Sequence, residues 1–292
     1  MDHDTRQVTA PDGRAIEAVS FGNRAGATVV THHGSPGSAS AAHFFDSLAD
    51  EFFVVGLSRP GYSTSTRQPG RAVGAAALDV AAVLDDLGRE DYLAVGWSGG
   101  GPHSLACAAL GAPRCRGAWS LAGVAPFDVD FDWTEGMGPE NVEDFALALE
   151  GGEAYEASVA KSAASFGAAT PDTVIELFGG LLSDVDAAAL ADGRAREIMA
   201  ATMVEAFSGG PWGAVDDDHA FFAPWGFAVA DITVPVWIWY GDQDLMVPPT
   251  HGAWLGANVP GARVEHDAAE GHVSIVTGRL DALAEQLRAA AA

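Results

Sequence analysis

The sequence has few cations. It holds 15 Lys and Arg against 40 Asp and Glu, for a formal net charge of −25, and Lys161 is the only lysine. Proteins bind phosphate backbones through clustered Lys and Arg that displace counterions, and no basic patch is visible, so nucleic acid is not expected as a partner. Anionic membrane surfaces are disfavoured for the same reason. We attribute the acidity to solubility or a salty habitat and not to a substrate preference.

Long apolar runs and cysteines are also scarce. No apolar run approaches the ~20 residues of a membrane helix, and residues 1–6 lack the pattern of a secretory signal. Cys107 and Cys115 are the only cysteines, which predicts reduced thiols and no disulfide framework. These absences predict a cytoplasmic protein without membrane contact.

The residues that are present predict an α/β fold. Hydrophobic residues make up 48% of the chain, enough for a packed core. Apolar, β-branched runs alternate with helical stretches, as in a sheet covered by helices. The predicted strands are 7–9, 15–21, 27–32, 52–57, 92–97, 117–122, 234–240 and 262–266. The predicted helices of this part are 75–87, 102–110 and one amphipathic helix over 274–292.

One stretch breaks the alternation. Between residues 127 and 225 the sequence turns helical, with segments at 142–149, 153–166, 173–182 and 195–207 separated by Gly, Pro and Asp. This composition predicts a helical cap, inserted into a core formed by residues 1–126 and 226–292.

A candidate nucleophile lies at the end of a predicted strand. Gly96-Trp97-Ser98-Gly99-Gly100 matches Gly-x-Ser-x-Gly, and it follows the strand 92–97 and precedes the helix 102–110. A serine on such a turn projects its hydroxyl from a strained backbone, and small residues two before and two after it let strand and helix approach. Gly96 and Gly100 meet that demand, so Ser98 is the predicted nucleophile. The alternative is a glycine-rich turn with an incidental serine.

Acyl transfer also needs donors for the oxyanion. The loop His33-Gly34-Ser35-Pro36 follows the strand 27–32, and the Ser35 and Gly99 N–H groups are the expected pair. Pro36 has no N–H to offer. His33 precedes the nucleophile in the chain, which favours a structural hydrogen-bonding role over a catalytic one.

The acid and the base are expected downstream of the nucleophile, in that order. Asp242 and Asp244 both follow the strand 234–240, and the spacing Gly-x-x-Asp-x-x-Val-Pro favours Asp244. Of the later histidines, His272 lies in a loop that can reach the edge of the sheet, whereas His251 falls in a helix and His266 in a strand. His272 would then take the Ser98 proton, with Asp244 orienting its ring.

This chemistry needs neither metal nor organic cofactor. The run Asp216-Asp217-Asp218-His219 could suggest a metal, yet it lacks a spaced partner cluster. We therefore interpret the run as a solvated loop or the start of a helix.

With these motifs in place the chain resembles the α/β-hydrolase superfamily, in particular its esterase and proline iminopeptidase-like members with a helical cap. The matching positions are 33–37, 58–63, 96–100, 241–244 and 271–272. The resemblance implies a mostly parallel, eight-stranded sheet with an antiparallel second strand, and a pocket between core and cap. Relatives that remove halogen or open epoxides use an aspartate nucleophile, so Ser98 disfavours those reactions.

The expected function is hydrolysis of a carboxylic ester or related acyl bond of a small, largely apolar molecule. One alternative is an aminopeptidase or other amide, thioester or carbon–carbon hydrolase; an aminopeptidase would need cap carboxylates, for which Glu135, Glu140 and Glu143 are available. Another is a ligand-binding sensor that retains the fold without turnover. Trp133, Trp212 and Trp225 would line an apolar pocket or pack in the core. The sequence does not determine whether the protein is a monomer or a homodimer.

Overall fold

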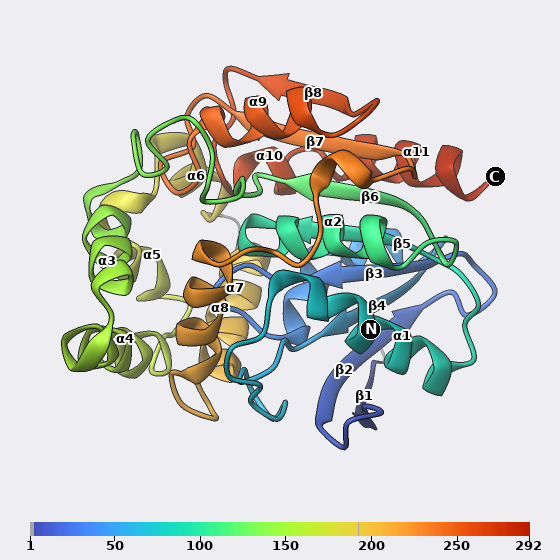
Figure 1. Cartoon of the computed structure of the whole chain (residues 1–292), viewed down its shortest axis with the longest axis horizontal. Coiled ribbons are helices and arrows are strands. Elements are labelled where there is room, and N and C mark those ends of the chain that lie inside the picture. The colour runs from blue at the N-terminus through green and yellow to red at the C-terminus, as the bar shows by residue number, and fades with distance from the viewer. Residues whose placement is uncertain (1–2, 192) are drawn as a thin grey trace.

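The computed structural model describes residues 3–191 and 193–292. Residues 1 and 2 of the predicted core and residue 192 of the predicted cap lie outside the described residues. Eight strands form one sheet in the order β1-β2-β4-β3-β5-β6-β7-β8 (Figure 1). The strands are β1 (Asp4–Thr9), β2 (Ala15–Gly22), β3 (Thr28–His32), β4 (Phe53–Leu57), β5 (Tyr92–Trp97), β6 (Cys115–Leu121), β7 (Val236–Gly241) and β8 (Arg263–Asp267).

The strand directions match the expected fold. Strand β2 runs antiparallel to both β1 and β4, and every other neighbouring pair is parallel. The chain adds β4 on one side of β3 and then crosses to add β5 on the other side. In open α/β sheets this change of direction creates a crevice at the carboxyl ends of the two strands, where ligands bind. The loop after β3 and the turn after β5 therefore meet at this crevice.

Helices cover both faces of the sheet. The helices α1 (Ala76–Leu87), α2 (Gly101–Leu110) and α9 (Pro249–Asn258) share one apolar cluster, whereas the 3-10 helix η1 (Ala39–Leu48) and α11 (Leu280–Ala291) share another. On β4, Val54 belongs to the second cluster and its neighbour Val55 to the first. This alternation follows from the two-residue period of a strand, so both faces of the sheet are buried.

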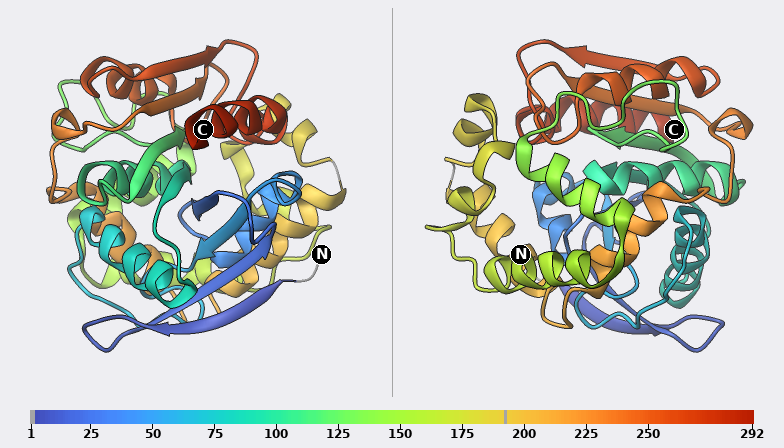
Figure 2. Two further views of the ribbon diagram at one scale, coloured as in Figure 1. Left: turned by 90° about the vertical axis from the view of Figure 1, so that its right-hand side faces the viewer. Right: turned by 60° about the vertical axis from the view of Figure 1, so that its left-hand side comes forward.

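The segment between β6 and β7 is helical, as expected. It contains α3 (Pro139–Glu150), α4 (Gly152–Phe166), α5 (Val174–Leu177), α6 (Asp184–Ala189), α7 (Gly193–Ala206) and α8 (Trp212–Phe222), here called the helical insertion. These helices gather on the left of Figure 1, and the right-hand view of Figure 2 brings them forward. That this insertion acts as a separate cap stays a prediction.

Two predicted helices were wrong in their extent. The segment 173–182 breaks after α5 into a 3-10 turn, Gly179–Leu181, where Gly179 adopts φ +54°. The tail forms α10 (Ser274–Thr277) and α11 instead of one helix, because the chain leaves helical geometry at Arg279 after Gly278. Helix interiors tolerate glycine poorly, so both breaks have a local cause. Within the described residues, no helix has the length and apolarity needed to cross a membrane.

Candidate active site

The turn after β5 has the strained geometry expected of a nucleophile. Ser98 has φ +57°, a left-handed conformation that non-glycine residues seldom adopt. A Cβ on Gly96 would overlap the Gly100 carbonyl, and one on Gly100 would overlap the His32 carbonyl. Glycine at both positions thus lets β5, the turn and β3 approach, and it leaves the partly exposed Ser98 at the crevice.

The loop after β3 lies directly against this turn. A Cβ built on Gly34 would lie 3.4 Å from the Ser98 Cβ, and one built on Gly99 would clash with the Ser35 hydroxyl. The predicted donors therefore come from adjoining segments. The Gly99 N–H belongs to the first turn of the 3-10 helix Ser98–Gly100, where amides have no partner inside the helix. The structure brings Ser35 and Gly99 together beside Ser98; their role as oxyanion donors stays a prediction.

Asp244 and His272 form a buried pair. The His272 Nδ1 lies 2.8 Å from the Asp244 Oδ2, and both residues are 2% exposed. The other carboxylate oxygen of Asp244 accepts the N–H groups of Met246 and Val247 at 2.8 and 2.7 Å. Because a carboxylate only accepts hydrogen bonds, Nδ1 carries the proton and Nε2 is left to act as a base.

The pair also sets the basicity of the imidazole. Burial lowers the pKa of His272, but the charge of Asp244, its hydrogen bond and the charge of Asp186 raise it more, so the pKa lies above its ordinary value of 6.5. A raised pKa makes the neutral ring a stronger base. The arrangement can therefore accept a proton from a hydroxyl at the crevice.

Ser98 and His272 face the same cavity without a hydrogen bond between them. The His272 ring lies against the ring of Trp97, the residue directly before Ser98, and the two ring centroids are 5.9 Å apart. Hydrogen bonds between a nucleophile and its base are often long or poorly aligned before substrate binds, and they shorten in the reacting complex. His272, the predicted base, thus lies at the same cavity as Ser98, the predicted nucleophile, but the two are not hydrogen-bonded.

Two cavities adjoin Ser98. The apolar chamber reaches His272, and its apolar lining includes Phe44, Trp97, Phe178, Met199, Met203, Met246 and Val273. The second chamber lies on the Gly99 side; its lining is also mostly apolar, but it includes the polar side chains Asn141, Asp144, Ser162 and Asp218. Most of these side chains belong to the helical insertion, so the insertion shapes the space around Ser98.

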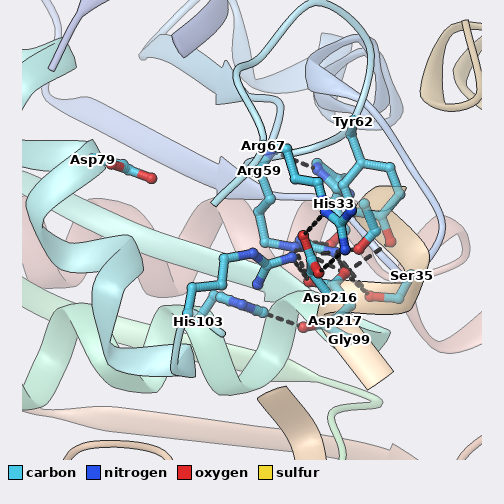
Figure 3. A network of polar contacts seen from close by, with 12 residues as sticks. His33, Ser35, Arg59, Tyr62, Arg67, Asp79, Gly99, His103, Asp216 and Asp217 are labelled. Atoms are coloured by element: carbon cyan, nitrogen blue, oxygen red, sulfur yellow. Dashed lines mark hydrogen bonds and ion pairs between the residues drawn. The ribbon is translucent and has the colours of Figure 1, made fainter. Parts of the chain in front are cut away.

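The interpretation of Asp216, Asp217 and Asp218 as a solvated loop or helix start was wrong. They lie inside α8, and Asp217 is completely buried. Its carboxylate binds Arg59 at 2.6 Å, Arg71, the Ser35 hydroxyl, and the Tyr62 hydroxyl at 2.9 Å (Figure 3). A buried charge is tolerated only when it is paired in this way. The acidic run therefore anchors the insertion to the core.

This network also holds the loop of the predicted oxyanion donor. Arg59 donates to the carbonyls of His33 and Gly34 and, at 2.8 Å, to the Ser35 hydroxyl (Figure 3). Burial opposes ionisation of Asp217, but Arg59 and Arg71 hold its pKa well below the ordinary 3.8. Sequence reasoning missed this role because Arg59 and Asp217 are 158 residues apart in the chain.

Other histidines and acids take structural places. The His33 ring accepts the Arg59 N–H at 3.1 Å and donates to the Gly34 carbonyl at 2.6 Å, as expected of a structural residue. His251 is buried between the Ala125 N–H and the Trp133 carbonyl. Asp242 contacts the exposed His266 at 2.6 Å and lines neither chamber at Ser98. In the described part of the chain, no group of His, Cys, Asp and Glu is arranged to hold a metal ion.

Residues considered for the pocket lie elsewhere. Trp133 and Trp225 are buried in the core, and Trp212 is exposed under Arg67. None of Glu135, Glu140 and Glu143 lines a chamber at Ser98; the carboxylates that do are Asp144 and Asp218. Burial raises the pKa of Asp218 to about 7, and the Tyr155 hydroxyl donates to it at 2.6 Å.

Comparison with known proteins decides the family. Residues 27–278 match the family described as alpha/beta hydrolase fold. The chain belongs to the α/β-hydrolase family. The expected fold class is therefore confirmed, and so is the expectation of a hydrolase. No curated protein matches this α/β hydrolase at a significant level.

Solved structures share this α/β-hydrolase fold over nearly their whole length. An alpha/beta hydrolase fold protein from Nakamurella multipartita is 24% identical with a TM-score of 0.67, covering 98% of this chain and 99% of its own. An esterase from Rhodococcus sp. ECU1013 is 20% identical with a TM-score of 0.69, covering 97% and 99%. An enol-lactonase from Burkholderia xenovorans LB400 is 19% identical with a TM-score of 0.64, covering 98% and 99%. At these identities the likeness shows the fold alone.

Proposed function

We propose that this α/β hydrolase cleaves carboxylic esters of small, largely apolar molecules through Ser98, His272 and Asp244. The observation that carries the proposal is the buried pair of Asp244 and His272, joined by a 2.8 Å contact between Oδ2 and Nδ1, with His272 lining the same cavity as Ser98. The left-handed backbone of Ser98 and the adjoining Ser35 and Gly99 loops support it. Two of the solved structures with the same fold are named as an esterase and an enol-lactonase.

In this mechanism the Ser98 hydroxyl attacks the carbonyl carbon of the ester and gives its proton to the His272 Nε2. The Ser35 and Gly99 N–H groups bind the oxyanion of the tetrahedral intermediate. His272 then passes its proton to the leaving alkoxide, and an acyl-enzyme forms on Ser98. A water molecule, deprotonated by His272, then attacks the acyl-enzyme; the bond between the acyl group and the Ser98 oxygen breaks, the acid leaves, and His272 returns the proton to Ser98. Asp244 keeps the ring in the required tautomer throughout.

The apolar chamber is suited to bind a small hydrophobic acyl or alcohol group of the substrate. Its lining is dominated by methionine and aromatic side chains, and methionine adapts to ligands of different shape. Since Ser98 and His272 both line the chamber, an ester with an apolar group bound there would have its carbonyl at the nucleophile.

Substitution of Ser98 tests the proposal. The wild-type protein should hydrolyse short p-nitrophenyl esters and react with a fluorophosphonate at Ser98. Ser98→Ala should no longer be labelled, and its kcat should fall by about 10⁶-fold. Ser165→Ala, at an exposed position, should keep both the labelling and the wild-type kcat. Full activity in Ser98→Ala would refute the nucleophile. Labelling of Ser98 without hydrolysis of any ester would favour the ligand-binding alternative.

A second candidate function is favoured by the two acidic side chains of the second chamber. Asp144 and Asp218 line this space beside Ser98, and such carboxylates suit the ammonium group of an amino-acid amide or ester. Amino-acid anilides, compared with p-nitrophenyl esters of equal size, separate the two. For an aminopeptidase, Asp218→Asn should raise KM for the anilide and leave the uncharged ester unaffected; equal effects on both substrates argue against it.

A further inference from the structure

Asp186 of the insertion makes unusual contacts with the His272 loop. It lies in α6, is completely buried, and its carboxylate accepts three successive backbone N–H groups. Oδ2 accepts the His272 N–H at 2.9 Å, and Oδ1 accepts those of Val273 and Ser274 at 2.7 and 3.0 Å. Ser274 is the first residue of the short helix α10 and Val273 its N-cap, a place where N–H groups have no partner within the helix. A charged acceptor stabilises such donors more than a neutral one does.

The surrounding residues are fitted to this contact. The Ser183 hydroxyl donates to the Asp186 Oδ2 at 2.9 Å and so fixes the carboxylate. A Cβ on Gly271 would lie 2.5 Å from the same oxygen, so only glycine there lets the carboxylate reach the loop. On its other side the His272 carbonyl accepts the Trp97 indole N–H at 3.0 Å. The backbone of His272 is thus held by the insertion on one side and by the nucleophile strand on the other.

We infer that Asp186 is a positioning residue that holds the His272 imidazole in its working place and makes this place depend on docking of the helical insertion. The inference rests on the proposed function, because it needs His272 as the base. Asp186 does not reach the reacting atoms; it acts through the backbone of His272 to Ser274. If the insertion moved away, these three amides would lose their acceptor and the loop would lose its fixed position.

The test compares Asp186→Asn with Asp184→Asn. Both remove one carboxylate from the same helix, but Asp184 is exposed. In Asp186→Asn the introduced side-chain amide would turn its N–H donors toward the backbone N–H donors of the loop. Since a displacement of about 1 Å can cost 10²-fold in rate, Asp186→Asn should lower kcat by about 10²-fold with KM within about twofold. Asp184→Asn should match the wild type in both.

Two further readouts separate positioning from a general loss of structure. Rates are expressed per site titrated with fluorophosphonate, so unfolded molecules do not count. The downfield proton resonance of the His272–Asp244 hydrogen bond should be lost or shifted in Asp186→Asn and kept in Asp184→Asn. Gly271→Ala places a methyl group against the same carboxylate without changing the charge, and it should lower kcat in the same way. If Asp186→Asn does not fold, Gly271→Ala tests the positioning role of Asp186 in its place.

The possible results distinguish this inference from the proposed function. Unchanged kcat per titrated site in Asp186→Asn, or in Gly271→Ala where the first variant does not fold, overturns the role of Asp186 while Ser98 and His272 stand. Full activity of His272→Ala overturns the proposed function, and the inference with it. A raised KM with unchanged kcat would show that Asp186 shapes the substrate chamber instead, and it also overturns the inference.

Discussion

The Trp97 indole Nε1 donates a hydrogen bond to the His272 carbonyl at 3.0 Å. This bond joins the residue before the proposed nucleophile to the proposed base, although they are 175 positions apart. Trp97→Phe removes the donor and keeps an aromatic ring. Because one such bond contributes about 1 kcal/mol, we expect kcat/KM to fall about fivefold in an ester hydrolysis assay.

Trp239→Phe provides the matched control for Trp97. Trp239 is also buried, but its indole N–H has no partner within the described chain. It should lose stability in a urea titration with little change in kcat/KM. Equal losses of activity in the two variants would contradict a role for the Trp97 hydrogen bond.

Asp244→Asn should impair catalysis less than Ser98→Ala does. The amide oxygen would stay with the Met246 and Val247 N–H donors, so the amide NH2 group would face Nδ1 and favour the wrong tautomer of His272. We expect kcat to fall by about 10⁴ with little change in KM. Initial rates on a p-nitrophenyl ester measure this, and Asp242→Asn, outside the chambers, is the control. A larger loss in the control would reverse the assignment of the acid.

The pH dependence of kcat/KM should report His272. Only the neutral ring accepts the Ser98 proton, so activity rises as pH increases through the pKa of His272. Because that pKa is raised, the midpoint should lie above 6.5. Rates between pH 5 and 9 at constant ionic strength give the midpoint. A midpoint below 6.5 would show that burial outweighs the charges of Asp244 and Asp186.

Asp217→Asn should strongly destabilise the protein. It leaves Arg59 and Arg71 buried without their shared carboxylate, which typically costs about 3–5 kcal/mol in the free energy of unfolding. Urea unfolding at pH 7 measures this. Glu51→Gln, which breaks a solvent-screened surface pair with Arg288, should change the free energy of unfolding little. Equal losses in the two variants would mean that burial of the network adds nothing.

The same network predicts how stability changes in acid. The pKa of folded Asp217 lies well below 3.8, so its contribution is fully present above the unfolded pKa and is lost as pH falls further, through the folded value. The difference in unfolding free energy between wild type and Asp217→Asn should therefore shrink below about pH 4. A constant difference down to pH 2 would indicate that the variant acts through packing alone.

Met203→Ala should change acyl-chain preference. Met203 lines the apolar chamber beside Ser98, and shortening it makes room for a longer chain. One methylene in such a pocket is worth about 1–3 kcal/mol, so kcat/KM for longer p-nitrophenyl esters should rise about tenfold relative to the acetate. Met137→Ala is the control, since Met137 is buried in the core outside both chambers. An unchanged preference would place the acyl group in the second chamber.

The sequence by itself predicted the eight strands and most of the helices, though not α6 or α8, and named Ser98, Asp244 and His272 as candidates. Both depend on local signals: the two-residue period of buried strands, and a nucleophile turn that needs glycine at positions 96 and 100. These signals survive in the linear chain because each arises from neighbouring residues. Where the local signal was weak, as across Gly179 and Gly278, the predicted helices ran too far.

Only the tertiary structure decided which carboxylates matter outside those motifs. Asp186 and Asp217 look like any of the 40 acidic residues in the sequence. Their place follows from burial and from partners far along the chain, at residues 272–274 for Asp186 and at Arg59 and Arg71 for Asp217. An unpaired charge costs much free energy only when it is buried away from water, and only the folded structure determines which charged groups are buried next to one another.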